Sequence, residues 1–183
     1  MTILKIDSSI TGENSVSRQL TGAILAQLAA QHPDQAMVER DLVAQPLNHL
    51  TLPEFADTSV LDEFLAADTI ILGAPMYNFS VPSQLKAWID RIAIAGKTFR
   101  YTAEGPVGLV GDKRVIVALS RGGFYGPDSP ASGYEHLKTY LTSVFGFIGI
   151  TPKFVTADGI AVGPEQRAVA VAGALEEIQR LAA

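Results

Sequence analysis

The chain has 183 residues, of which 48% are hydrophobic and 18% are charged, and its formal net charge is -5 at pH 7. This composition supports a folded core and argues against disorder. The basic residues are scattered, so nucleic acid and anionic membranes are not expected as partners. The sequence contains no Cys, which excludes disulfides, iron–sulfur clusters and thiol chemistry.

The sequence also lacks an apolar stretch of about 18 residues that could span a membrane, and its N-terminus lacks the pattern of a signal peptide. The three His residues are dispersed along the chain, so we expect no metal site. We therefore expect a soluble, cytoplasmic protein that forms a single domain over residues 1–183.

Strand-like apolar runs alternate along the chain with segments of helical periodicity. In the first helical segment, for example, Leu20, Ile24 and Leu28 recur every four residues. In chain order, the predicted elements are a strand at 2–7, a helix at 16–31, a strand at 37–42, a connection at 44–58, a helix at 60–67, a strand at 68–74, a helix at 83–94, a strand at 114–120, a helix at 134–148, a strand at 153–159 and a helix from Pro164 to about Leu181.

This alternation predicts an α/β three-layer sandwich, in which a five-stranded parallel sheet has helices on both faces. The runs at 2–7, 68–74 and 114–120 are the most continuously apolar, which is typical of central strands. The other two runs carry more polar residues and suit the edges, so the strand order 2-1-3-4-5 fits. Ligands of such sheets bind beyond the carboxyl ends of the strands, where the strand order reverses.

Three loops follow the three central strands and should therefore converge at one edge of the sheet. The first, at 8–18, is rich in hydroxyl and amide side chains and enters a helix, whose free N–H groups suit a phosphate. Its polar residues are Ser8, Ser9, Thr11, Asn14, Ser15 and Ser17. Asn14 or Ser15 could equally serve only as a helix N-cap.

The second loop, at 74–82, places Tyr77, Asn78 and Phe79 after a buried strand, where they could face a flat aromatic ligand. The alternative is that Met76 and Phe79 pack beneath the loop as core. The third loop, at 120–129, contains Gly122-Gly123, which would let the backbone approach a ligand closely or would form an ordinary turn. Together the loops describe a ligand with a phosphate at one end and a flat polar ring at the other, and flavin mononucleotide (FMN) fits that shape.

Four motifs extend this interpretation into a family resemblance. They are SSI followed by NSVSR, the segment 74–110 that begins APMYNFSVPSQLKAW, SRGGFYGP at 120–127, and GFIGI at 146–150. The sequence resembles the FMN-dependent NADH:azoreductase family over nearly its whole length. Members of that family also reduce quinones, share the flavodoxin-like fold and form homodimers with a site at each end of the interface.

The resemblance implies the FMN contacts residue by residue. They are Ser9, Ser15, Val16 and Ser17 at the phosphate; Met76, Tyr77, Asn78 and Phe79 along the isoalloxazine ring; and Ser120, Arg121, Gly122 and Gly123 at its pyrimidine end. It implies that Tyr101 and Phe147 line the substrate side. The sequence departs from the family at the connection 44–60, which looks shorter, and at the loop after Gly123, which looks longer; both affect the mouth of the substrate pocket.

The resemblance implies ping-pong turnover, in which NADH delivers a hydride to FMN and a quinone or azo compound then takes two electrons. The amides of Gly122 and Gly123 would stabilise charge on the reduced ring, and Asn78 would hold the ring edge. No acid–base side chain is assigned with certainty, and Tyr101 and Tyr125 are the candidate proton donors. The substrate-side candidates are thus Asn78, Tyr101, Tyr125 and Phe147.

Three alternatives stay open. A flavodoxin-type electron carrier would use the same fold, although its docking surface should be more acidic than a net charge of -5 indicates. A quinone reductase could reduce azo dyes only incidentally. An α/β domain could bind a different nucleotide.

Overall fold

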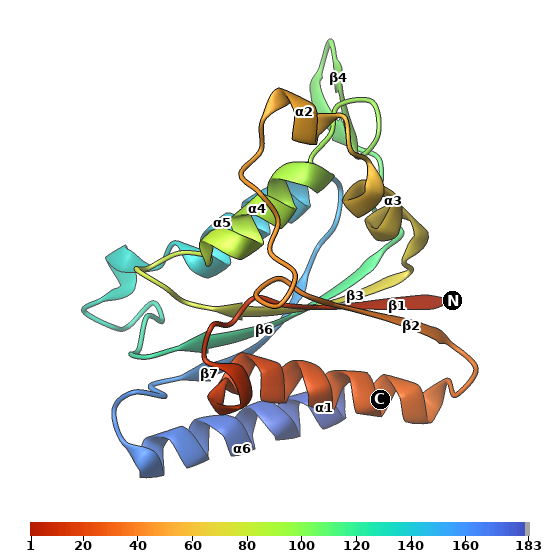
Figure 1. Cartoon of the computed structure of the whole chain (residues 1–183). Coiled ribbons are helices and arrows are strands. Elements are labelled where there is room, and N and C mark those ends of the chain that lie inside the picture. Colours follow the sequence, from red (N-terminus) through yellow and green to blue (C-terminus); the bar gives the residue numbers. More distant parts are fainter. Residues whose placement is uncertain (182–183) are drawn as a thin grey trace.

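Five parallel strands form the central sheet of the computed structural model, which describes residues 1–181 (Figure 1). The strands are β1 (Thr2–Asp7), β2 (Ala36–Asp41), β3 (Thr69–Pro75), β6 (Arg114–Arg121) and β7 (Lys153–Asp158). Their order is β2-β1-β3-β6-β7, which confirms the predicted order 2-1-3-4-5. Every residue of β3 is buried, whereas β2 is largely exposed, as expected for a central and an edge strand.

Helices cover both faces of this sheet. Helices α1 (Val16–Gln31) and α6 (Pro164–Arg180) lie on one face, and α3 (Ser59–Ala66), α4 (Ser83–Ile92) and α5 (Leu137–Phe147) lie on the other (Figure 1). Side chains of β3 alternate between the two layers, because Ile71 packs with α1 and α6 while Ile70 and Leu72 pack with the other helices. Within residues 1–181, the helices lack the length and hydropathy needed to cross a bilayer.

A two-stranded hairpin was not predicted from the sequence. Its strands, β4 (Phe99–Thr102) and β5 (Gly105–Gly108), pair antiparallel. Each has only four residues, and the second contains two glycines and a proline, so neither shows the alternation expected of a strand. Tertiary contacts hold the hairpin instead, because the Phe99 ring lies 4.4 Å from that of Phe147 on α5.

Two further boundaries differ from the prediction. The connection at 44–58 contains a short helix, α2 (Leu52–Phe55). The helix predicted from 134 begins only at Leu137, and Tyr134 belongs to the separate 3-10 turn η2 (Ser132–Tyr134). The Glu135 carboxylate accepts hydrogen bonds from the N–H groups of Leu137, Lys138 and Thr139. It thus replaces the backbone carbonyls that a preceding helical turn would have supplied, and α5 begins here.

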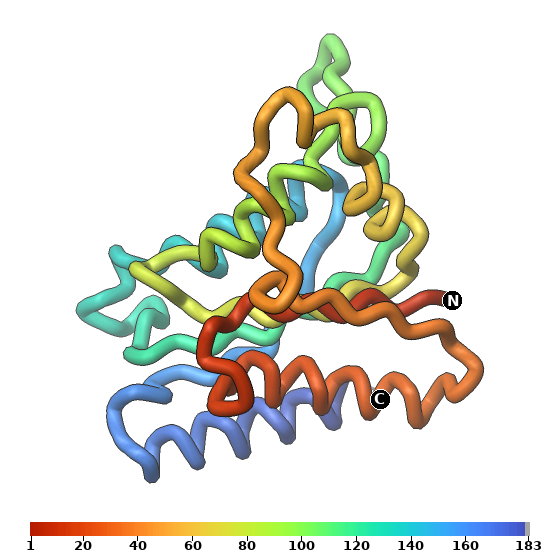
Figure 2. Tube along the Cα trace, in the orientation of Figure 1, coloured from red at the N-terminus to blue at the C-terminus, as the bar shows by residue number. Residues whose placement is uncertain are grey.

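The chain trace brings four loops to one side of the sheet. Figure 2 shows the loops after β1, β3, β6 and β7 leaving the sheet on the same side, on the left of the view. The first of them contains the 3-10 turn η1 (Gly12–Asn14). The β4–β5 hairpin and α2 lie away from these loops, at the top of the molecule in Figure 1. Any site built from the loops is therefore separate from the hairpin of the same chain.

Candidate functional site

A cavity of about 550 Å³ opens where these four loops meet. Its lining comes from the first loop and the start of α1, from the end of β3 and the loop after it, from the β6 loop, and from the β7–α6 segment. The residues are Ser9, Thr11, Asn14, Ser15, Val16, Pro75, Met76, Tyr77, Ser120, Gly122, Ile160, Ala161 and Arg167. The volume falls within the range of about 300–1,000 Å³ that is typical of small-molecule sites.

The N-terminus of α1 forms one end of this cavity. Ser15 is the N-cap, and its hydroxyl accepts a hydrogen bond from the Arg18 N–H at 3.2 Å. The N–H groups of the first helical turn have no intrahelical acceptor and carry the positive end of the helix dipole. Because Ser15 and Val16 line the cavity, that end suits an anion. The Ser15 hydrogen bond confirms the N-cap interpretation, and the anion site at the same helix terminus stays a prediction.

An ion-paired arginine fixes the first loop from behind. The Arg18 guanidinium donates to the Ser9 carbonyl at 2.9 and 3.2 Å and forms a two-pronged ion pair with Asp41 at 2.7 and 2.8 Å. The Arg18 hydrogen bonds are the main reason why the pKa of Asp41 falls to about 2. The loop is therefore tied to the end of β2 before any ligand binds.

The second loop turns on two residues with left-handed backbone. Tyr77 and Ser80 exchange two backbone hydrogen bonds of 3.1 Å, and between them Asn78 and Phe79 have φ values of 46° and 72°. Asn tolerates this region, but a bulky residue there costs roughly 1 kcal/mol or more. The two-residue turn therefore stores backbone strain at the edge of the cavity.

Contacts made by Phe79 offset this cost. Its ring stacks on Tyr134 with a centroid distance of 5.1 Å and lies edge-on to Tyr125 at 6.3 Å. Its carbonyl accepts the His136 N–H at 3.0 Å. The Phe79 side chain thus packs on the third loop rather than facing the cavity. Of the two aromatics of the second loop, Tyr77 therefore lines the cavity and Phe79 does not.

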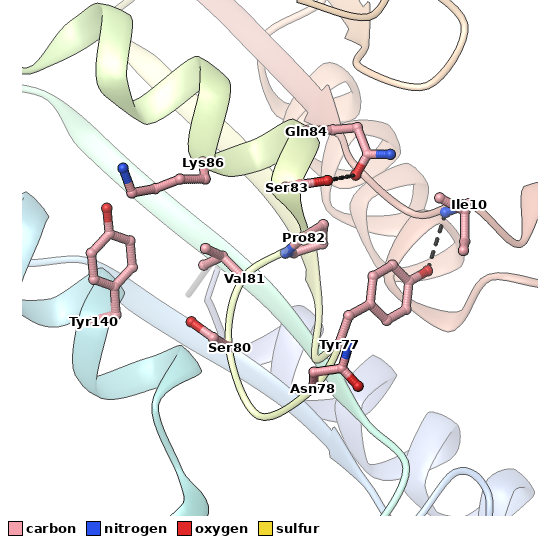
Figure 3. A pocket seen from close by; sticks show the side chains of 10 residues that line it. All are labelled: Ile10, Tyr77, Asn78, Ser80, Val81, Pro82, Ser83, Gln84, Lys86 and Tyr140. Carbon is pink, nitrogen blue, oxygen red and sulfur yellow. Dashed lines mark hydrogen bonds between the residues drawn. The ribbon is translucent and has the colours of Figure 1, made fainter. Parts of the chain in front are cut away.

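Tyr77 links the first and second loops and divides two hollows. Its hydroxyl accepts the Ile10 N–H at 3.1 Å and lies 3.3 Å from the Ser9 hydroxyl. On its other side is a second cavity, of about 590 Å³, shown in Figure 3. That cavity is lined by Ile10, Tyr77, Asn78, Ser80, Val81, Pro82, Ser83, Gln84, Lys86 and Tyr140. Asn78 therefore lies at the rim between the two hollows.

The third loop contributes backbone rather than side chains. Gly122 lines the cavity, and its carbonyl accepts the Ala161 N–H at 3.0 Å. Gly123 lies next to Tyr125 and accepts the Gly159 N–H at 3.1 Å. A glycine at 122 leaves the main chain bare, so a ligand can reach it.

Arg121, between the cavity residues Ser120 and Gly122, is buried and paired. Its guanidinium forms two hydrogen bonds of 2.6 Å with Asp158 and lies 3.4 Å from the Glu135 carboxylate. It also lies over the Tyr125 ring at 5.9 Å. The side chain therefore joins β6, β7 and the start of α5, and it supports the loop rather than lining the cavity.

The predicted substrate-side aromatics lie in two places. Tyr125 packs beside Gly123 at the third loop. Tyr101 and Phe147 lie on either side of Phe99, at the hairpin and at the C-terminal end of α5. The N-terminal end of α5 meets the loops, and its ten-residue rise to Phe147 spans about 15 Å. Tyr101 and Phe147 are therefore remote from the cavity of their own chain.

The predicted FMN contacts thus fall into four groups. Those that line the 550 Å³ cavity are Ser9, Ser15, Val16, Met76, Tyr77, Ser120 and Gly122. Ser17 and Arg121 are buried behind its walls, Phe79 and Gly123 pack at the third loop beside it, and Asn78 lines the second cavity. Within the described part of the chain, no cluster of three His, Asp or Glu residues is suited to a metal ion.

The β7–α6 segment also lines the cavity, which was not predicted from the sequence. Ile160, Ala161 and Arg167 line the cavity, whereas the sequence predicts only an edge strand at 153–159 and a helix from Pro164 here, with no site residue. The signal was available in the topology, because the carboxyl end of β7 lies at the same edge as that of β6. Thr11 and Asn14 also line the cavity; the first loop was described with them, but they were not among the predicted contacts.

Sequence comparison relates this chain to proteins of known fold and activity. The sequence profile of the flavodoxin-like fold family matches residues 1–182. The FMN-dependent NADH:quinone oxidoreductase 2 of Bradyrhizobium diazoefficiens is 54% identical over 201 residues, covering 100% of both chains. That alignment has more positions than this chain has residues, so the relative carries segments that this chain lacks.

Two solved structures extend the comparison to three dimensions. The azoreductase from Bacillus anthracis str. Sterne has a TM-score of 0.90 and 31% identity, covering 100% of this chain and 98% of that chain. The FMN-dependent NADH-azoreductase from Bacillus anthracis str. Ames Ancestor, solved in complex with FMN, has a TM-score of 0.84 and 25% identity, covering 100% and 99%.

Proposed function

The chain belongs to the flavodoxin-like family of FMN-dependent NADH:quinone oxidoreductases and azoreductases, and we propose that it is an enzyme that transfers electrons from NADH to quinones and azo compounds through FMN. One observation carries this proposal most directly: the cavity has the N-terminus of α1 at one end and is otherwise lined largely by apolar side chains, among them Met76 and Ile160. FMN combines a phosphate with a flat ring, so it fits this division.

The chemistry of the cavity walls fits the cofactor at both ends. At the phosphate end, hydroxyls of Ser9 and Ser15 and the amides of Val16 and Ser17 supply donors without a carboxylate in the lining. At the ring end, Met76 and Tyr77 supply apolar surface, and Gly122 supplies bare backbone. Held by these residues, FMN would supply the two-electron chemistry that links NADH to the acceptor in ping-pong order.

In this proposal, the residues that line the cavity bind and orient FMN and carry out no acid–base chemistry. The hydroxyl of Tyr77 is already engaged by the first loop, which holds its ring in a fixed orientation. The Gly122 and Gly123 amides are proposed to stabilise negative charge near the pyrimidine edge through preorganised dipoles. We propose Tyr125, which lies beside Gly123, and Tyr101 as the groups that supply a proton to the acceptor.

We further propose that two copies of the chain assemble and complete each other's sites. Tyr101 is 73% exposed and lies with Phe147 away from its own cavity, so it can reach a substrate only in another copy. Leu52 and Phe55 on α2 are 88% and 53% exposed, and such apolar surface is typical of an interface. We also propose a cytoplasmic enzyme that consists of a single domain over 1–183; residues 182 and 183 lie outside the described part.

An absorbance spectrum of the purified protein, followed by addition of NADH without oxygen, tests this function. Flavin bands that bleach with NADH and return with a quinone or an azo dye are expected. Bands that persist with NADH would favour an electron carrier. A protein that is colourless and takes up no added FMN would refute the proposal. The ratio of kcat/KM for quinones and azo dyes then shows whether azo reduction is incidental.

A further inference from the structure

Arg167 brings a positive charge to the phosphate end of the cavity. It lies in the first turn of α6 and lines the cavity together with Asn14, Ser15 and Val16. Its Nη2 atom donates to the Asn14 carbonyl at 2.7 Å, and Asn14 immediately precedes the N-cap of α1. The guanidinium therefore lies beside the helix terminus that is proposed to receive the FMN phosphate.

In the part of the chain that the structure describes, the neighbours of Arg167 do not stabilise a positive charge at this position. A cation in the first turn of a helix opposes the helix dipole, so the position is electrostatically unfavourable on its own. Within residues 1–181, Arg167 forms no ion pair with a carboxylate. A guanidinium has five N–H donors, and one hydrogen bond to a carbonyl leaves the others available to an anion.

The other arginine near this helix terminus is already committed. Arg18 forms its ion pair with Asp41, lies 3.9 Å from Asp7 and donates to the Ser9 carbonyl. It lines a different hollow, with Lys5 and Asp7, on the far side of the first loop. Among the described residues, Arg167 is thus the one Lys or Arg that lines the 550 Å³ cavity.

We infer that Arg167 is the counter-ion of the FMN phosphate and sets the preference of the site for FMN over riboflavin. A phosphate monoester carries a charge of about −1.5 to −2 at pH 7, whereas a helix N-terminus supplies only about +0.5. A guanidinium adds a full charge and paired donors that match phosphate oxygens. This inference rests on the proposed FMN cofactor and assigns the residue that the hydroxyl-rich first loop alone does not supply.

Fluorescence titration of the apoprotein with FMN and with riboflavin tests the inference. The two flavins share the ring and differ in the phosphate, so a counter-ion affects only FMN. Arg167→Gln is expected to weaken FMN binding about tenfold and to leave riboflavin binding unchanged. Arg167→Lys should retain part of the FMN affinity, and added salt should weaken FMN binding more in the wild type than in Arg167→Gln.

Arg180→Gln is the matched control, because Arg180 is exposed in the last turn of the same helix, about 20 Å along it; its FMN affinity should equal that of the wild type. Equal FMN affinity in Arg167→Gln and wild type would overturn the inference. So would equal weakening of FMN and riboflavin, because that pattern means that Arg167 only holds the first loop. If riboflavin binds too weakly to titrate, the salt dependence decides. A wild type that binds neither flavin would refute the proposed function and this inference with it.

Discussion

Replacing Asp41 by Asn tests the link between the ion pair behind the first loop and the stability of the fold. In the wild type, Arg18 donates to both carboxylate oxygens of Asp41 and to the carbonyl of Ser9. The amide keeps the shape of the side chain and removes its charge. Arg18, whose side chain is only 20% exposed, then loses its nearest anion.

The magnitude follows from the pKa of Asp41. A decrease from 3.8 to about 2 on folding corresponds to at most ~2.5 kcal/mol of stability. The Asp41 side chain is 36% exposed, so solvent screens the pair and we expect about 1 kcal/mol. Because the same guanidinium holds the first loop, Asp41→Asn should also weaken FMN binding.

The sign of the pH dependence follows from the lowered pKa. A carboxyl whose pKa is lower in the folded state stabilises the protein above its unfolded pKa of 3.8 and ceases to do so as pH falls toward 2. The difference in stability between wild type and Asp41→Asn should therefore be complete at pH 7 and reduced to about half at pH 3.

Urea unfolding at those two pH values measures the difference. Asp112→Asn is the control, because Asp112 is exposed in the turn before β6, and its stability should match the wild type at both. If Asp41→Asn is as stable as the wild type at pH 7, or if the gap is undiminished at pH 3, the reasoning is wrong.

Three further outcomes are expected. Gly108→Ala should lower stability by ~3 kcal/mol in thermal or urea unfolding, because its Cβ would lie 2.1 Å from the Gly149 nitrogen; Gly22→Ala, with open space in α1, should instead gain up to ~1 kcal/mol. Tyr77→Phe should lose about 1 kcal/mol in the same assays, since its hydroxyl bridges two loops, and should bind FMN less tightly; unchanged FMN affinity would contradict a positioning role. Tyr101→Ala should keep FMN affinity and lower kcat/KM for quinones, and unchanged turnover would remove Tyr101 from the substrate side.

Patterns that repeat along one element predicted most of the fold. The apolar runs of β3 and β6 are nearly continuous because those strands are buried on both faces, and β1 is interrupted only at Lys5, so their place in the sheet could be inferred. The hairpin and the start of α5 depend on a few long-range or capping contacts, such as those of Phe99 with Phe147 and of the Glu135 carboxylate with α5. Such contacts leave no periodic signal in the sequence.

The candidate site likewise has a part that the sequence predicts and a part that depends on contacts in the folded chain. The three loops after central strands were predicted, because the carboxyl ends of parallel strands must lie at one edge. Arg167 reaches the cavity from the first turn of α6, far in sequence from the lining residues of the first loop, and its contact with Asn14 exists only in the folded chain. The orientation of Phe79 was also unpredictable, because a left-handed turn and a stacking partner decide it.

The Phe79 contacts also bear on how this enzyme could diversify. Tyr134 and His136 hold the turn through Phe79, so substitutions there would disturb the cofactor seat. The tip of the third loop, at 126–130, is largely exposed. Its hydrogen bonds stay mainly within the third loop, as between the Ser129 hydroxyl and the Phe124 carbonyl. The length of this tip can therefore change among relatives without disturbing the contacts that hold the turn at Phe79.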